Sequence, residues 1–186
     1  MPLNYHSSKA YEISCHSIER QASWEDLRDG RDFCFLAYYR IAYQVMFMSY
    51  ETTIRFQHVD NAGILYFSRA FELCHEALED ILIAAGYPLE EILREGDWVM
   101  PIVHAESDYR KPMCLGDKIV ISAEVETGGG SSLTFRYAMK NSEGVVHAEV
   151  KLVHVVLDRK TFKAQKIPPV FLKAIEGLGL FGDQED

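Results

Sequence analysis

One long amphipathic segment, placed between segments of alternating polarity, most restricts the fold of this chain. From Phe67 to Ala85 apolar residues recur every three or four positions, which predicts one long helix with a broad apolar face. Gly86 follows where a helix commonly ends. Residues 50–56 alternate between apolar and polar side chains and predict a strand. After a short helical turn at 87–94, four more strands are predicted, at about 98–109, 117–126, 132–141 and 144–157.

This order of elements decides the fold class. One strand, one helix and four consecutive strands cannot form parallel crossover units, so the sheet must be antiparallel and must bury its apolar face on the single helix. We therefore predict an α+β fold, a five-stranded antiparallel sheet wrapped around one long central helix. With 186 residues, 48% of them apolar, the chain can build one well-buried core.

The predicted domain covers residues 48–176, between an N-terminal extension at 1–47 and an acidic C-terminal tail at 177–186. Met48 stands directly before the first strand. One hypothesis is therefore that the domain, and with it the natural protein, begins near Met48. The rival hypothesis is that residues 1–47 form an ordered extension that packs on the domain or on a partner. The sequence leaves both hypotheses open.

The charge of the chain restricts its partners. A net charge of -9 argues against a nucleic-acid or anionic-membrane surface, because both require basic patches. The longest apolar stretch, residues 33–48, contains Arg40 and Gln44 and is short for a membrane span.

Four dispersed cysteines and the lack of a secretory signal favour a reduced, cytoplasmic protein. The histidines are scattered, and His147 and His154 point to opposite faces of one predicted strand, so no metal site is expected.

The polar turn before the long helix carries a recognisable motif. In the run from Arg55 to Phe67, the pattern Asp-x-Ala-Gly-x-x-Tyr is filled by Asp60, Ala62, Gly63 and Tyr66. This run resembles the signature of the 4-hydroxybenzoyl-CoA thioesterase family of hotdog proteins. The resemblance extends over residues 50–175 and includes the later stretch Asp108-Tyr-Arg-Lys-Pro112.

Three further stretches resemble a narrower branch of that family, the 1,4-dihydroxy-2-naphthoyl-CoA thioesterases. They are Cys74-His-Glu-Ala77, Gly96-Asp97 and Pro101-Ile-Val-His-Ala105. The resemblance implies a hotdog fold, hydrolysis of an acyl-CoA to a free acid and CoA, and no cofactor apart from the CoA of the substrate. It also implies a homodimer or homotetramer with active sites between subunits.

Thioester hydrolysis needs one carboxylate and one oxyanion site, because the leaving thiol departs readily as a thiolate. We expect Asp60 to be the nucleophile or the general base; the alternative is that it only caps a turn. Gly63 and the free amides at the helix start would form the oxyanion site. By position in the motif, the resemblance assigns the polarising amide to Phe67, whose side chain is otherwise expected to be part of the core.

Four residues are expected to contact the substrate: Tyr66, His75, Glu76 and His58. His75 occupies a position that faces the ring substituent in the family's hydroxyaryl enzymes, so we expect it to bind an aryl hydroxyl; the alternative is an ordinary core or interface histidine. Glu76 is a reserve catalytic carboxylate or a solvated helix residue. His58 stands where many members of that family carry an acidic residue, two positions before the aspartate. Cations available for the CoA phosphates are Arg110, Lys111, Arg136, Lys140, Arg159 and Lys160.

The sequence thus predicts an acyl-CoA thioesterase with an aromatic, hydroxyaryl or dihydroxynaphthoyl, substrate. Three alternatives remain open. The first is a thioesterase for short or medium-chain acyl-CoA. The second is a hotdog hydratase or dehydratase that would use the pair of His58 and Asp60. The third is an acyl-CoA binding module without catalysis.

Overall fold

The computed structural model describes residues 49–128 and 130–181 of the chain. The predicted extension at 1–47 lies outside the described residues. In chain order the elements are β1 (Ser49–Thr53), the 3-10 turn η2 (Phe56–His58), α3 (Arg69–Ala84), α4 (Leu89–Glu95), β2 (Trp98–Val99), β3 (Ile102–Tyr109), β4 (Lys118–Gly128), β5 (Ser132–Asn141), β6 (Val146–Val155), β7 (Leu157–Asp158) and α5 (Pro169–Gly177).

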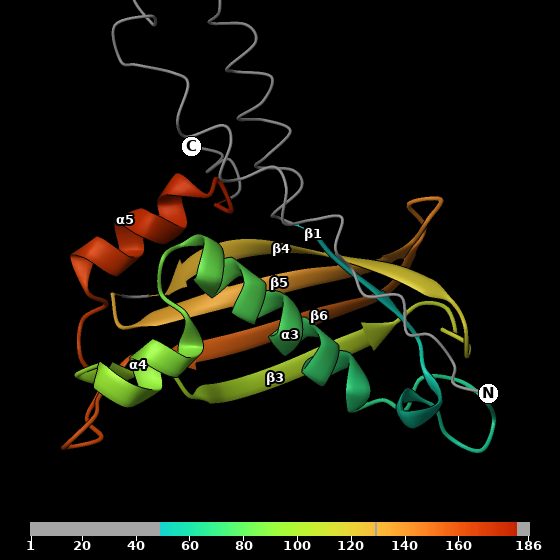
Figure 1. Ribbon diagram of the computed structural model, residues 1–186, viewed down its shortest axis with the longest axis horizontal. Coiled ribbons are helices and arrows are strands. Elements are labelled where there is room, and N and C mark those ends of the chain that lie inside the picture. Colours follow the sequence, from blue (N-terminus) through green and yellow to red (C-terminus); the bar gives the residue numbers. More distant parts are fainter. Residues whose placement is uncertain (1–48, 129, 182–186) are drawn as a thin grey trace, which may run out of the picture. The chain divides into compact units, whose positions relative to one another are not determined.

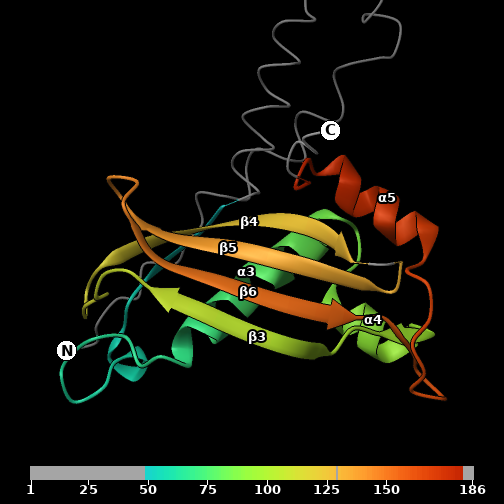
Figure 2. The same ribbon diagram turned by 180° about the vertical axis from the view of Figure 1, so that it is seen from behind.

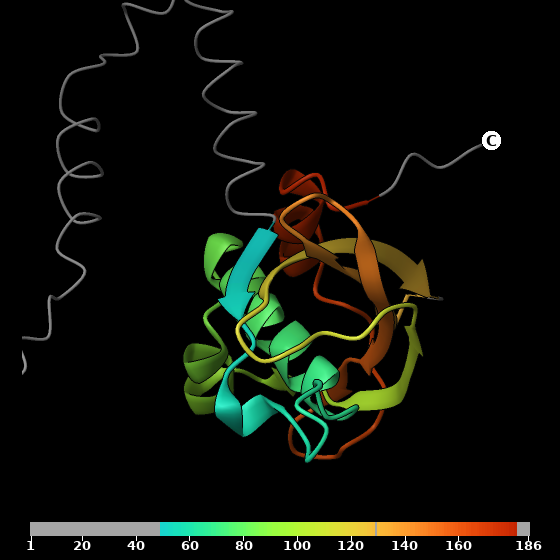
Figure 3. The same ribbon diagram turned by 90° about the vertical axis from the view of Figure 1, so that its right-hand side faces the viewer.

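The central feature is a five-stranded sheet with the order β1-β4-β5-β6-β3, in which every neighbouring pair is antiparallel. Helix α3 runs across the inner face of this sheet (Figure 1). The view along the molecule shows the sheet curving around α3 (Figure 3), and the opposite view shows the outer face with α3 behind it (Figure 2). The predicted α+β fold with a five-stranded antiparallel sheet is confirmed.

The core lies between α3 and the sheet because both present apolar stripes. Seven α3 residues are buried: Ala70, Leu73, Cys74, Ala77, Leu78, Ile81 and Leu82. They meet alternate residues of the strands, such as Ile119 and Ile121 of β4 and Phe135 of β5, each at most 1% exposed. Burial on this scale contributes roughly 1.5–3 kcal/mol for each large apolar side chain.

Helix α3 ends as its sequence predicts. Gly86 adopts a φ of +79° directly after the cap residue Ala85. The amide of Gly86 donates to the Ile83 carbonyl at 3.0 Å, and that of Tyr87 donates to the Leu82 carbonyl at 2.8 Å. These two bonds form a Schellman motif, in which a glycine tolerates the left-handed backbone that other residues resist.

Two predicted strands are interrupted. The segment 98–109 divides into β2, which pairs with β7, and β3, which pairs with β6. Pro101 stands at the break, where it lacks an amide to donate to a ladder. The segment 144–157 divides at Val156, whose amide donates to the Ser131 carbonyl at 2.8 Å instead of joining either ladder.

The C-terminal helix α5 was not predicted. It places Phe171 and Ile175 in the core, and the Phe171 ring meets those of Tyr87 and Trp98 at centroid distances of 5.0 and 4.8 Å. Beyond the helix, Leu180 is 1% exposed, and its carbonyl accepts from the Val125 amide of β4. The packed part of the chain therefore extends past the predicted boundary at residue 176, and the rest of the predicted tail, 182–186, lies outside the described residues.

Within the described residues, no helix is both long enough and apolar enough to cross a membrane. No group of three or more His, Cys, Asp or Glu side chains in this part of the chain is arranged to hold a metal ion.

Of the histidines in the described residues, one is buried in the core: His154, on the inner face of β6. Its Nδ1 atom lies 3.1 Å from the Met100 carbonyl, which only accepts, so the proton of the neutral ring belongs on Nδ1. The ring lies parallel to that of His75, with centroids 6.3 Å apart, and meets Phe135 edge-on. Burial lowers the pKa of His154, the bond to Met100 opposes this, and the neighbouring His75 lowers the pKa further.

His154 should make the stability of the fold depend on pH. Because its pKa in the folded state lies below the ordinary 6.5, its neutral form stabilises the fold above about pH 6.5, and this contribution is lost as the pH falls through the folded pKa. One such group gives a slope of at most about 1.4 kcal/mol per pH unit. We expect urea unfolding midpoints to fall from pH 7.5 to 5.5, and to fall less in His154→Phe.

The control is His104→Gln, which removes a half-exposed histidine from β3. A pH dependence that is equally flat in both variants, or unchanged in His154→Phe, would contradict this assignment.

Candidate active site

The loop between β1 and α3 holds Asp60 in a compact turn. The Asp60 Oδ1 atom accepts from the Ala62 amide at 2.8 Å, and the Asp60 carbonyl accepts from the Gly63 amide at 3.0 Å. Asp60 itself is exposed. Its Oδ2 atom accepts no hydrogen bond from the described residues. Asp60 therefore does cap a turn, as the alternative of a purely structural role requires. Its second carboxylate oxygen has no partner among the described residues, and the residue is exposed.

Gly63 is required by the backbone of this turn. Its φ is +75°, and a Cβ atom built on it would meet no atom within 4 Å. The conformation therefore selects glycine here, and the space above the residue is open. The Gly63 carbonyl accepts from the Leu115 amide at 3.1 Å, which attaches the turn to the segment before β4.

The rest of the loop is fixed to that same segment. The Leu65 amide donates to the Met113 carbonyl at 2.8 Å, and Ile64 forms an isolated bridge with Cys114. The Tyr66 amide donates back to the His58 carbonyl at 2.8 Å. The loop is therefore held at the end of the sheet where α3 begins and β3 ends, at the lower right of Figure 1.

Phe67 is not a core residue, because its side chain is 58% exposed and lies against the ring of Tyr66 at a centroid distance of 4.8 Å. Its carbonyl accepts a hydrogen bond from the Tyr109 hydroxyl of β3. Among the bonds of the described residues, none uses the Phe67 amide as a donor. This amide lies two positions before α3, so it stands at the positive end of a 16-residue helix dipole.

His58 and Asp60 form no pair. The His58 Nδ1 atom accepts from the Arg55 amide at 3.1 Å, so the ring caps its own 3-10 turn. A hydratase of this fold would need a histidine and an aspartate acting together on one acyl chain. The geometry around His58 gives no support to that alternative.

His75 and Glu76 follow each other in sequence but face opposite edges of the sheet. His75 lies beside His154 of β6, the strand next to β3. The Glu76 carboxylate accepts a hydrogen bond from the Tyr50 hydroxyl of β1. Burial raises the pKa of Tyr50 to about 12, and the Glu76 carboxylate raises it in the same direction. Because β1 and β3 are the two edges of the sheet, His75 lies toward the β3 side and Glu76 toward the β1 side. The partner of His154 on β3 is Ile102, at the opposite end of that strand from Tyr109.

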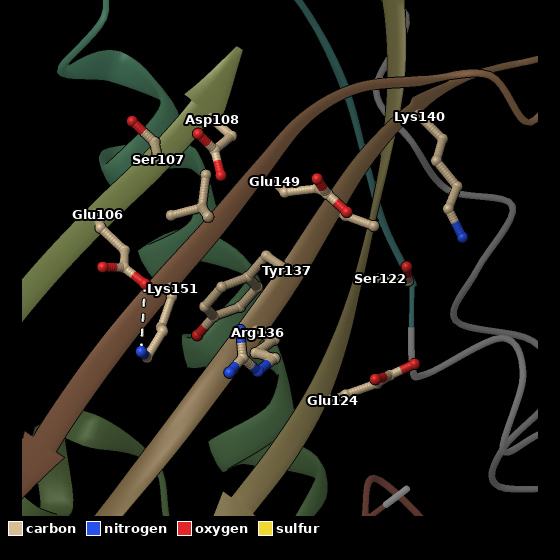
Figure 4. Close-up of a pocket in the computed structure, with 12 residues that line it drawn as sticks. Glu106, Ser107, Asp108, Ser122, Glu124, Arg136, Tyr137, Lys140, Glu149 and Lys151 are labelled. Atoms are coloured by element: carbon tan, nitrogen blue, oxygen red, sulfur yellow. Dashed lines mark ion pairs between the residues drawn. The ribbon is translucent and has the colours of Figure 1, made fainter. Parts of the chain in front are cut away.

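A cavity of about 310 Å³ lies elsewhere, on the outer face of the sheet (Figure 4). Four charged residues that are neighbours across the strands form a row from β4 to β3: Glu124, Arg136, Lys151 and Glu106. Lys151 and Glu106 form an ion pair of 3.1 Å. None of the predicted catalytic or acyl-binding residues lines this cavity, so we do not assign the active site to it; of the candidate phosphate cations, Arg136 and Lys140 lie there.

Three of the cations considered for the CoA phosphates already have partners. Arg110 pairs with Glu149 at 2.6 Å, and Arg136 pairs with Glu126 at 2.6 Å. The Arg159 guanidinium donates to carbonyls at the end of α4, including that of Gly96 at 3.2 Å. Arg159 therefore caps a helix, and these contacts reduce the set of free candidates for phosphate binding.

Tyr109 is the residue near the site that the sequence reasoning missed. It belongs to the stretch Asp108-Tyr-Arg-Lys-Pro112, which carried part of the family resemblance. Its hydroxyl reaches the backbone of a residue 42 positions earlier, and no local periodicity indicates such a contact.

The chain has clear relatives. Residues 54–175 match the Thioesterase-like superfamily. A 1,4-dihydroxy-2-naphthoyl-CoA hydrolase from Nostoc punctiforme is 34% identical over 131 residues, which cover 70% of this chain and 88% of the relative. A hydrolase of the same name from Acaryochloris marina is 31% identical over 122 residues, covering 64% of this chain and 88% of the relative.

Solved structures agree with this match. The crystal structure of Slr0204, a 1,4-dihydroxy-2-naphthoyl-CoA thioesterase from Synechocystis, has a TM-score of 0.65 at 26% identity and covers 69% of this chain and 94% of its own. The gentisyl-coenzyme A thioesterase BH1999 has a TM-score of 0.62 at 22% identity, covers 68% of this chain and 98% of its own, and shows the fold alone. The family and fold predicted from the motif around Asp60 are confirmed: the chain belongs to the Thioesterase-like superfamily and is a hotdog-fold thioester hydrolase.

Proposed function

We propose that this protein hydrolyses an aromatic acyl-CoA, of the hydroxyaryl or dihydroxynaphthoyl class, and that Asp60 is its catalytic carboxylate. The observation that carries the proposal is the placement of the Asp60 carboxylate and the free Phe67 amide in one loop at the start of α3. The names of the relatives from Nostoc punctiforme and Synechocystis support the substrate class.

In this mechanism the thioester carbonyl lies between the two groups. Asp60, through the oxygen that the turn leaves free, attacks the carbonyl carbon or activates a water that does so. Negative charge then develops on the carbonyl oxygen, where the Phe67 amide and the positive end of α3 stabilise it. The thiolate of CoA leaves without a strong acid, because its conjugate thiol has a pKa of roughly 8.5.

The first test is Asp60→Asn. The variant keeps an acceptor for the Ala62 amide but loses the carboxylate, so we expect thiol release to fall by about 10²- to 10⁴-fold. A thiol-reactive dye measures release from 1,4-dihydroxy-2-naphthoyl-CoA, 4-hydroxybenzoyl-CoA, benzoyl-CoA and decanoyl-CoA.

Glu124→Gln, which makes the same carboxylate-to-amide change on the outer face of β4, is the matched control and should hydrolyse at the wild-type rate. Fast release from decanoyl-CoA alone would favour the aliphatic alternative. Tight binding of all four esters without release would favour the non-catalytic binding module, and hydration of an enoyl-CoA would favour the hydratase.

We further propose that His75 binds a hydroxyl of the acyl ring, because it lies toward the β3 side of the sheet and Glu76 does not. Replacing His75 with alanine should reduce the preference for 4-hydroxybenzoyl-CoA over benzoyl-CoA by about 10-fold, the value of one hydrogen bond of about 1–1.5 kcal/mol. The measurement is the ratio of kcat/KM for the two esters.

Glu76→Ala is the control on the opposite flank of α3, and its ratio should equal that of the wild type. If His75→Ala keeps the preference and Glu76→Ala loses it, the two assignments are exchanged.

The active protein is proposed to be at least a dimer that pairs through β3. This eight-residue strand is an edge strand of the described sheet, and seven of its residues are exposed. Exposed apolar side chains continue from it into the Asp60 loop: Val103, Tyr109, Phe67, Tyr66 and Phe56. The open edge of a sheet is a template for another strand, and a second copy of β3 supplies one in antiparallel order.

Sedimentation equilibrium tests the assembly. We expect a mass of at least two 21.3-kDa chains for the wild type. Val103→Glu places a charge on the β3 edge and should shift the protein towards monomer with loss of activity. Val170→Glu, at a residue that is 72% exposed on α5, is the matched control and should not. A monomeric wild type with full activity would contradict the dimer.

A further inference from the structure

The hydroxyl of Tyr109 forms the link between strand β3 and the loop that carries the oxyanion amide. The Tyr109 hydroxyl donates to the Phe67 carbonyl, and Phe67 supplies the amide proposed to polarise the thioester. The other bonds from the loop to the rest of the domain are backbone bonds that involve Ile54, Gly63 and Leu65, and they reach only the segment 113–117. Within the described residues, the Tyr109 bond is the only hydrogen bond from residues 58–68 to β3.

The hydrogen bond from Tyr109 is placed to fix the backbone of Phe67 at the start of α3. Helix α3 begins at Arg69 after the cap residue Ser68, and its first turn uses the Tyr66 and Ser68 carbonyls, which accept from the Arg69 and Phe71 amides. The Phe67 carbonyl lies between them and is not used by the first turn. Without the Tyr109 hydroxyl, no bond among the described residues would fix the backbone of Phe67 itself.

We propose that Tyr109 is a positioning residue of the thioesterase reaction. Its hydroxyl holds the Phe67 backbone so that the amide faces the reacting carbonyl. This inference rests on the proposed function, because the amide matters only if a thioester carbonyl is bound beside it. Tyr109 does not touch the reacting atoms, so its contribution acts through the alignment of another group.

The bond contributes little to stability, which separates positioning from folding. Tyr109→Phe keeps the ring that the proposed β3 pairing would cover, and one hydrogen bond between neutral groups contributes only a small net amount to stability. Alignment has a larger effect on rate, because a misplacement of about 1 Å in an active site can cost roughly 10²-fold, and loss of a whole oxyanion donor about 10²- to 10³-fold.

Tyr109→Phe removes the hydroxyl and keeps the ring. We expect kcat for benzoyl-CoA to fall about 10- to 100-fold, with an unchanged KM and an unchanged urea unfolding midpoint. Tyr137→Phe is the matched control, because the Tyr137 hydroxyl is buried and has no hydrogen-bond partner among the described residues. It should retain the wild-type kcat.

A spectroscopic measurement reads the amide directly and needs no hydrolysis. Phenacyl-CoA is a thioether ketone that cannot be hydrolysed, and its ¹³C-labelled carbonyl stretch is resolved by isotope-edited infrared difference spectra. An aligned amide donates to this oxygen and lowers its stretching frequency in the wild type. The lowering should be largely lost in Tyr109→Phe and retained in Tyr137→Phe.

The outcomes separate the two proposals. If the wild type hydrolyses thioesters and Tyr109→Phe keeps both kcat and the frequency shift, the positioning role is overturned and the proposed function stands. If no ester is hydrolysed but the shift is present and depends on the Tyr109 hydroxyl, the proposed function fails, and the catalytic part of the Tyr109 role fails with it; only the hold of Tyr109 on the Phe67 amide then stands. A wild type without any shift, or an equal loss of kcat in Tyr137→Phe, overturns the role of Tyr109.

Discussion

The structure depends on the burial of one helix against one sheet. Helix α3 places seven residues against the inner faces of the strands, and the sheet curves around it. Helix α5 adds Phe171 and Ile175 to the same core, but α3 is the helix that runs across the sheet. The loop before α3 is thereby fixed at the end of the sheet, and the Phe67 amide in it donates no hydrogen bond among the described residues. This end of the helix is where we propose the oxyanion site.

The Asp60 turn shows how one residue can serve both structure and chemistry. One carboxylate oxygen accepts from the Ala62 amide and holds the turn. The other oxygen has no partner among the described residues and is available for the proposed reaction. An Asx turn by itself is consistent with a purely structural residue, but this turn also holds the carboxylate in the loop that contains the Phe67 amide. Structural and catalytic interpretations of Asp60 are therefore compatible.

Much of the fold was predictable because it is encoded in local periodicity. The alternation in β4, β5 and β6 and the three-to-four spacing in α3 each report a buried face, and Gly86 reports a left-handed cap. The helix α5 was missed because it is only nine residues long and follows a stretch of irregular backbone. The division of the strand at 98–109 depends on Pro101, whose effect on the ladder was underestimated.

The site was predictable only in part, for a different reason. The motif indicated Asp60, Gly63 and Phe67, but it did not indicate what holds them. Tyr109 and Phe67 are 42 residues apart, and the acceptor is a backbone carbonyl that carries no sequence signal. The directions of His75 and Glu76 depend on how α3 is rotated over the sheet, which the apolar spacing fixes only approximately.

That rotation has a consequence for how such a chain can diverge. Neighbouring codons encode His75 and Glu76, yet the His75 ring lies beside β6 and the Glu76 carboxylate accepts a hydrogen bond from β1. If His75 selects the acyl group as proposed, substitutions at this codon alter substrate choice while those at the next alter the attachment of the first strand. Selection for a new substrate and selection for a stable fold can then act on adjacent positions with little interference.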